Sequence, residues 1–184
     1  MLVSNLRSAA VVLLCAWVGQ YLLAMATPRL IMEVLHRTVG ERYGHNTLNV
    51  GTTPDASFRD VVRPSPDLIY GVCAYDLTDG PVAISADVPR RYWSMQFYQM
   101  NTNNFAGFTN KRGDETLAGE TFKVTLVGPA HRAADHSGTV VRSPTDRGVM
   151  LLRASAIGDS DITQTAVQRS TCEAVGIQDQ GFRS

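Results

Sequence analysis

The chain has 184 residues, of which 44% are hydrophobic and 18% charged, and its 17 basic residues balance its 17 acidic residues. This length predicts one domain with an added terminal element, and the hydrophobic content argues against disorder as the main state. The balanced charge leaves no basic excess to neutralise a phosphate backbone, so nucleic acid is excluded as a general partner.

The N-terminal segment is predicted to be a membrane helix. Residues 9–26 (AAVVLLCAWVGQYLLAMA) carry no charge, and a helix of this length spans roughly 27 Å, close to the hydrocarbon thickness of a bilayer. A cleaved signal peptide is the alternative, because Ala24-Met25-Ala26 resembles a cleavage site. The run is longer than a usual signal core. We therefore expect a retained single-pass anchor over residues 1–27, with the lipid bilayer as its partner.

Residues 28–57 are predicted to form an amphipathic helix followed by a polar linker. Pro28 and Gly40 are placed like the start and the end of a helix. The expected apolar stripe of this helix consists of Leu30, Ile31, Val34, Leu35 and Val39. The helix either continues the membrane helix past a kink or lies along the interface.

Residues 58–184 are predicted to form a β-rich soluble domain. Short runs of β-branched and aromatic residues alternate with turn signals and are not separated by helical patterns, so the class is mainly β, with a small antiparallel β-sandwich or a barrel-like domain. The expected strands are 68–77, 81–87, 92–100, 104–109, 121–127, 139–142 and 148–154. A C-terminal helix is expected to begin at Asp159 or Ser160 and to stop near Gly176.

One candidate ligand site surrounds the start of the first strand. Pro64 and Pro66 hold the backbone extended there. Arg63, Asp67 and Tyr70 could then meet, either as a site for an anion or as a salt bridge that pins the strand. The structural interpretation is the favoured one.

A second candidate site lies on the strand 92–100. Tyr92, Gln96 and Tyr98 share one face of this strand, with Arg91 before it. Such a face could line a ligand pocket, be solvated, or be covered by a partner. Arg142 and Arg153 would add further guanidinium groups to a basic lining if the segments converged.

No metal site, cofactor or catalytic residue is predicted. His131, Asp135 and His136 lie close together, but in a loop-like segment without the spacing of a metal site. The patterns of nucleophilic hydrolases and of nucleotide-binding loops are also missing. We therefore lean against an enzyme.

The soluble part contains two cysteines. Cys73 stands in a strand-like run and Cys172 in a helix-like run. They could form a disulfide in an exported domain, or be buried thiols in a cytosolic one. The arginines that flank the apolar run would place the domain in the cytoplasm, although by a small margin.

Several separate motifs resemble the family named Domain of Unknown Function 1254, in order and spacing, over about residues 59–153. The motifs are Val62–Tyr70 (VRPSPDLIY), Tyr75–Leu77 (YDL), Gly80-Pro81, Arg91–Trp93 (RYW), Asn103–Phe105 (NNF), Val127–Pro129 (VGP) and Arg142–Thr145 (RSPT). The chain is similar to short members with an N-terminal membrane helix.

The resemblance implies a β-rich fold, often joined to or encoded beside a companion domain with a jelly-roll-like sandwich. Longer members more often have Asn where Ser65 stands. The family name records no general activity, so no catalytic residue is carried over. Resemblance to exported members favours a periplasmic domain, against the charge count.

Together these features predict a membrane-anchored, non-enzymatic accessory or interaction protein, a subunit of a larger membrane complex with a membrane-protein partner. The alternative is a periplasmic small-molecule-binding or enzymatic domain for an anionic or carbohydrate-like ligand. A third hypothesis, a carrier of lipid or another hydrophobic molecule, would require a sizeable apolar cavity between the sheets.

Overall fold

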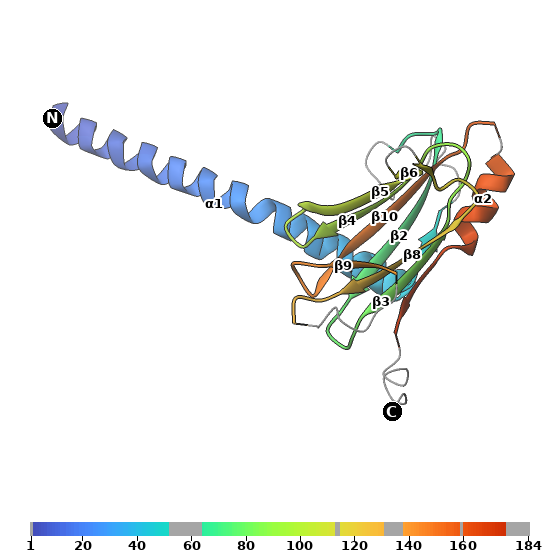
Figure 1. The fold of residues 1–184 in the computed structure, drawn as a ribbon. Coiled ribbons are helices and arrows are strands. Elements are labelled where there is room, and N and C mark those ends of the chain that lie inside the picture. The colour runs from blue at the N-terminus through green and yellow to red at the C-terminus, as the bar shows by residue number, and fades with distance from the viewer. Residues whose placement is uncertain (1, 52–63, 113–114, 131–137, 159, 176–184) are drawn as a thin grey trace.

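A long N-terminal helix runs into two facing β-sheets in the computed structural model of this chain (Figure 1). The structure describes residues 2–51, 64–112, 115–130, 138–158 and 160–175. Helix is almost as abundant as strand, because the first helix alone contains 42 residues.

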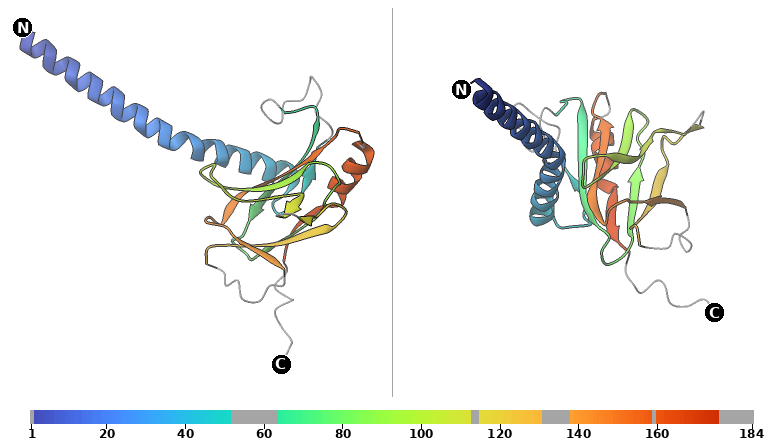
Figure 2. Two further views of the ribbon diagram at one scale, coloured as in Figure 1. Left: turned by 45° about the horizontal axis from the view of Figure 1, so that its top comes forward. Right: turned by 90° about the vertical axis from the view of Figure 1, so that its left-hand side faces the viewer.

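The first helix, α1 (Leu2–Tyr43), is continuous and contains Pro28. The proline cannot donate a hydrogen bond to the preceding turn. Side chains on both sides of it bond to carbonyls of that turn: Thr27 Oγ1 donates to Leu23 O at 2.7 Å, and Arg29 Nη1 donates to Met25 O at 3.0 Å. The expected boundary at residue 27 therefore lies inside one helix, which bends as it reaches the domain (Figure 2).

The N-terminal part of α1 projects away from the sheets, and every residue from 5 to 27 is exposed. Its mean hydropathy reaches 2.0. By length and composition it could be a membrane span or a signal sequence.

The first sheet has five antiparallel strands in the order β1-β2-β10-β4-β5. These strands are β1 (Asn49–Val50), β2 (Leu68–Asp76), β10 (Arg147–Ser155), β4 (Trp93–Gln99) and β5 (Asn104–Thr109). The predicted linker therefore contributes an edge strand, β1.

The second sheet has four strands in the order β11-β3-β8-β9 and is mixed, because β8 and β9 run parallel. These strands are β11 (Thr171–Ala174), β3 (Val82–Asp87), β8 (Thr121–Val127) and β9 (Thr139–Arg142). A small hairpin of β6 (Lys111–Arg112) and β7 (Glu115–Thr116) and the helix α2 (Ser160–Arg169) complete the fold.

All seven strands expected from the sequence are present, with ends within one residue of their predicted positions. The barrel-like alternative is wrong, because β5 and β9 end the two sheets without pairing to each other. A purely antiparallel arrangement is also wrong, because β9 runs parallel to β8.

The C-terminal helix is shorter than predicted. It ends at Arg169, where Ser170 Oγ donates to Ala166 O at 3.1 Å and satisfies a carbonyl of the last turn. Cys172 therefore lies in strand β11 and not in a helix. The expected stop at Gly176 falls outside the described residues.

The core lies between the two sheets and is closed at one end by α2, whose Val167 is buried. Trp93, Met95 and Phe97 of β4 point inward, as the alternation along this strand predicts. Across the core, the ring of Trp93 meets that of Phe122 on β8 at 6.0 Å between centroids. Cys73 of β2 and Cys172 of β11 form a disulfide that joins the two sheets, with Cα atoms 6.6 Å apart.

Candidate functional site

The C-terminal part of α1 packs on the outer face of the five-stranded sheet, against β2 and β10 (Figure 2). Met32, His36 and Val39 form the buried stripe of this part of the helix. His36 Nε2 hydrogen-bonds with the backbone oxygen of Tyr75 at 3.0 Å. The helix is thus a component of the folded domain.

This buried stripe shares only Val39 with the predicted one. Leu30, Ile31 and Val34, expected to form the apolar face, are 57–66% exposed. They lie on the side of α1 that faces away from the sheet, because burial selects the positions that touch β2 and β10. Sequence periodicity shows that a stripe exists but does not show which stripe is covered.

Beyond α1, the outer face of the first sheet carries a row of polar residues. Arg153 on β10 lies opposite Tyr70 on β2 and Ser94 on β4 in the strand register. Directly opposed residues have Cβ atoms about 5 Å apart. Arg153 Nε is buried and has no hydrogen-bond partner among the described residues. The sequence predicted this arginine as one member of a converging basic lining, and its alternation with buried Leu152 and Ala154 places it on this face.

The three predicted residues of β4 and its approach lie beside this row. Gln96 Oε1 accepts a hydrogen bond from Asn104 Nδ2 at 2.8 Å, and the Tyr92 hydroxyl lies 3.0 Å from Ser94 Oγ. Tyr98 is partly buried on the same face. The polar face predicted from the alternation therefore exists, and two of its members already bond within the sheet.

The remaining predicted residues are dispersed. Arg91 is exposed and packs beside Gly158, in the connection from β10 to α2. Arg142 belongs to β9 of the other sheet, where Nη1 donates to Gly128 O and Pro129 O at 3.1 and 3.2 Å. It anchors the connection between β8 and β9, so the expected convergence of guanidinium groups does not include Arg142.

The first candidate cluster is described only in part. Arg63 falls outside the described residues. The hydroxyl of Tyr70 accepts a hydrogen bond from the backbone N–H of Ser65 at 2.9 Å, and Asp67 N–H donates to Ser65 Oγ at 3.4 Å. These bonds fix the turn that leads into β2.

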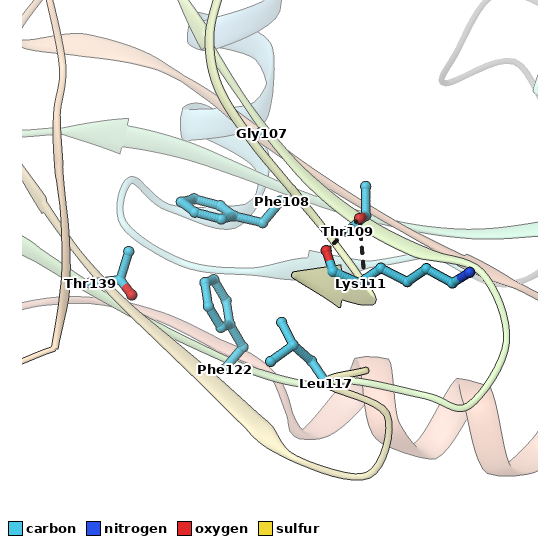
Figure 3. Close-up of a pocket in the computed structure, with 7 residues that line it drawn as sticks. All are labelled: Gly107, Phe108, Thr109, Lys111, Leu117, Phe122 and Thr139. Carbon is cyan, nitrogen blue, oxygen red and sulfur yellow. Dashed lines mark hydrogen bonds between the residues drawn. The ribbon is translucent and has the colours of Figure 1, made fainter. Parts of the chain in front are cut away.

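A pocket of about 280 Å³ opens between the free edges of the two sheets (Figure 3). Phe108 of β5 and Phe122 of β8 line its floor, with ring centroids 4.9 Å apart, and Leu117 and Thr139 flank them. Lys111 also lines it, but its amine points away from the phenyl rings (Figure 3). The pocket is smaller than the roughly 300–1,000 Å³ usual for ligand sites and much smaller than a lipid chain requires.

A polar network crosses the core near the α1 contact. The hydroxyl of Tyr75 donates to Tyr98 O at 3.1 Å and lies 3.1 Å from Ser143 Oγ, which in turn donates to Thr145 O at 2.6 Å. Burial raises the pKa of Tyr75 to about 12, and the Ser143 hydrogen bond offsets only part of that shift. A Cβ at Gly148 would overlap the Tyr75 hydroxyl, so this position requires glycine.

Asp76, next in the chain, is held ionised. Partial burial by itself would raise the pKa of this carboxyl. Hydrogen bonds from the hydroxyl and the backbone N–H of Thr78, together with nearby His36 and His45, outweigh that effect and hold the pKa below its usual range.

Within the described part of the chain, no group of three His, Cys, Asp or Glu residues could hold a metal ion. The predicted cluster of His131, Asp135 and His136 lies outside the described residues.

Comparison with known proteins gives a family and a fold. The family model "Protein of unknown function (DUF1254)" matches residues 45–173. A crystal structure of a protein from Vibrio parahaemolyticus superposes with a TM-score of 0.58 at 13% identity, covering 88% of this chain and 40% of that one. The structure of an uncharacterized protein from Burkholderia cenocepacia gives 0.49 at 16% identity, covering 68% and 36%.

The chain therefore spans less than half the length of these two proteins. No curated protein matches it. The likeness to the Vibrio structure, at this low identity, concerns the fold alone.

Proposed function

The chain belongs to the DUF1254 family, which brings no known activity with it, and we propose that it is a single-pass, membrane-anchored accessory protein that holds its β-rich domain against a partner in a membrane complex. The observation that carries this proposal is that one helix, α1, provides both an exposed apolar segment and a packed part of the domain.

The exposed segment requires a non-aqueous environment. Residues 9–26 are uncharged and exposed, and each large apolar side chain kept in water forgoes roughly 1.5–3 kcal/mol. A bilayer removes this cost and matches the length of the run.

The continuity of α1 supports retention of the anchor over cleavage. Cleavage after Ala26 would cut the middle of a regular helix, and the part that follows packs against the sheet through its buried residues Met32, His36 and Val39. An uncut helix also fixes the orientation of the domain relative to the membrane.

The helix offers a contact surface for a membrane partner. Leu30, Ile31 and Val34 extend the apolar surface beyond residue 26 on the side that faces away from the sheet. An exposed apolar stripe continuous with a membrane span is typical of a helix that packs beside another protein. The disulfide between the sheets supports an oxidising compartment, the periplasm, for the domain.

The anchor is tested by extraction of native membranes at alkaline pH. We expect the wild-type chain to stay in the membrane fraction and Leu14→Arg to be released, because an arginine at the centre of a span costs about 2.5–3.5 kcal/mol. Thr38→Arg, in the exposed part of α1 beyond the span, is the matched control and should stay bound. Release of the wild type would contradict the anchor.

The accessory role is tested by purification in mild detergent and mass spectrometry of the co-purifying proteins. A stoichiometric membrane protein is expected with the wild type, and it should be lost with Val34→Asp while membrane retention is unchanged. A strictly monomeric protein from native membranes would rule out the accessory role.

A second candidate function is binding of a small anionic or carbohydrate-like molecule at the polar face. The buried, unpartnered Nε of Arg153, between Tyr70 and Ser94, supports it. Screening of carboxylates, phosphates and sugars should find a ligand whose binding is lost in Arg153→Gln. Equal binding by wild type and variant would exclude this face.

A further inference from the structure

We propose that a pocket between α1 and the turns after β4 and β9 binds the phosphate of an anionic phospholipid headgroup. This inference rests on the proposed membrane anchor. The pocket has a volume of about 260 Å³ and is lined by Arg29, Glu33, Met100, Asn101, Thr145 and Arg147.

The pocket lies at the depth of the lipid headgroups. Arg29 and Glu33 follow Ala26 by three and seven residues, which places them about 4.5 and 10 Å beyond the apolar run. The headgroup layer on each side of a bilayer is roughly 5–7 Å thick, so Arg29 lies within this layer and Glu33 just beyond its outer boundary. The turn after β4, with Met100 and Asn101, meets α1 at this level (Figure 1).

The polar side chains of α1 face the domain at this level. Arg29 and Glu33 line the pocket, whereas Leu30, Ile31 and Val34 face away from the sheet. The helix can therefore keep one side in apolar surroundings while its other side forms a polar pocket at the membrane surface.

Two guanidinium groups reach the pocket from different elements. A guanidinium has five N–H donors. Arg29 uses one on Met25 O, and Arg147 directs Nη1 and Nη2 to Glu33 Oε1 and Oε2, each at 3.3 Å. Among the described residues no other acceptor contacts them. Donors therefore remain on both arginines, and arginine forks match phosphate oxygens.

The local charge favours an anion. Arg29 and Arg147 contribute two positive charges and Glu33 one negative charge, which leaves a net charge of one positive unit. Asn101 and Thr145 add neutral hydrogen-bonding groups, and Met100 adds an apolar side chain to the lining. The volume suits one small polar group better than a drug-sized ligand. A headgroup phosphate matches this charge, size and depth together.

The experiment titrates the full-length chain in mild detergent with phosphatidylglycerol and, separately, with phosphatidylcholine of the same acyl chains, followed by native mass spectrometry. We expect phosphatidylglycerol to bind several-fold more tightly than phosphatidylcholine. Arg29→Gln should weaken phosphatidylglycerol binding about tenfold, because a charge-assisted hydrogen bond is lost. Arg37→Gln, two turns further along α1 and outside the pocket, is the matched control and should stay within twofold of wild type.

Glu33→Gln gives a result of the opposite sign. Removing this carboxylate raises the net charge and frees both Nη atoms of Arg147, so phosphatidylglycerol binding should become tighter. Weaker binding by Glu33→Gln would show that the ion pair only supports the fold and would overturn the proposal.

A soluble phosphate ester tests whether the pocket recognises a lipid headgroup or a free phosphate compound. Millimolar glycerol phosphate should leave bound phosphatidylglycerol in place, because it lacks the acyl chains that hold the lipid beside α1. Displacement would overturn the lipid assignment. Equal affinities of wild type and Arg29→Gln, in protein that stays in membranes, would overturn the headgroup site alone, whereas release of wild-type protein from membranes would overturn the anchor and this site together.

Discussion

Tyr75 connects three segments of the fold through its hydroxyl and its backbone oxygen. The hydroxyl reaches Tyr98 O on β4 and Ser143 Oγ after β9, while the backbone oxygen of the same residue accepts a hydrogen bond from His36 Nε2 on α1. Polar groups inside a core are retained when they are hydrogen-bonded, and leaving one unpaired costs about 1–3 kcal/mol. This tyrosine therefore couples the docking of α1 to the packing of both sheets.

Tyr75→Phe is expected to lower the free energy of unfolding by about 1–2 kcal/mol at pH 7, because Tyr98 O and Ser143 Oγ lose a partner. The substitution should also change how the free energy of unfolding depends on pH above pH 10. The folded pKa is raised from 10.0 to about 12, so the wild-type stabilisation is fully present below pH 10 and is lost as pH rises towards 12, by at most about 2.7 kcal/mol.

The measurement is chemical unfolding of the full-length chain in detergent between pH 7 and pH 11. The Tyr75→Phe curve should be flatter above pH 10 than that of the wild type. Tyr21→Phe, which alters an exposed phenol of α1 outside the folded domain, is the control and should follow the wild type within about 0.5 kcal/mol. If the free energies of unfolding of wild type and Tyr75→Phe changed with pH in the same way, the raised pKa of a buried Tyr75 phenol would be contradicted.

Single positions of the candidate site were predictable where strand alternation determines the face. Gln96 and Tyr98 lie on the predicted face of β4, and Arg153 shares that face through the register of β10 with β4. Strand alternation did not predict the positions of Arg142 and Arg91. Residues at the ends of strands and in turns are positioned by the chain connections, whose sequences have no regular period.

The strands show how far local pattern determines an element. All seven predicted strands form within one residue of their predicted ends, because turn residues such as Asp79-Gly80 and Asn101-Thr102 end the runs. The segment after α2 was expected to remain helical and instead forms β11, where Cys172 pairs with Ile84 of β3 in the register. Tertiary pairing overrides weak local propensity in such short segments.

The disulfide between β2 and β11 closes a loop of 99 residues and links the two sheets. Cys172→Ser is expected to lower the free energy of unfolding by about 2–5 kcal/mol, because a long loop regains its freedom in the unfolded chain. Thermal unfolding with and without a reductant should show the same loss in the wild type and none in Cys172→Ser.

Cys15→Ser is the matched control, since Cys15 is a free, exposed thiol of α1 and its replacement should leave the melting temperature unchanged. Alkylation of denatured but unreduced protein should label Cys15 alone. Labelling of Cys73 and Cys172 under these conditions would contradict the disulfide and remove its support for the periplasm.

Across the whole molecule, α1 is a continuous helix that would join the proposed anchor rigidly to the domain. Its continuity through Pro28 and its contacts at Met32, His36 and Val39 fix both the height and the rotation of the domain. A flexible linker would fix neither. A partner that recognises the apolar stripe of α1 and the domain together would depend on this geometry.

Alanine insertions after Ala26 test the fixed orientation. Two alanines rotate the domain by about 200° relative to the anchor, whereas four rotate it by only about 40° and raise it about 6 Å. We expect partner recovery to fall at least tenfold with two insertions and to return in part with four, while both variants stay in the membrane. Recovery that declines steadily with insert length would indicate that height alone matters.

The sequence by itself determined most of the elements and the apolar composition of the N-terminal segment: an uncharged run long enough to span a bilayer, and alternating strands between clear turns, both of which depend on local periodicity and length. The tertiary structure decided what these elements do together. Contacts in the folded chain decide which stripe of α1 is buried, that β9 pairs parallel with β8, and that the segment after α2 forms the strand β11. They also bring Arg29 and Arg147 to one pocket. These outcomes depend on contacts between residues far apart in the chain, which no local pattern encodes.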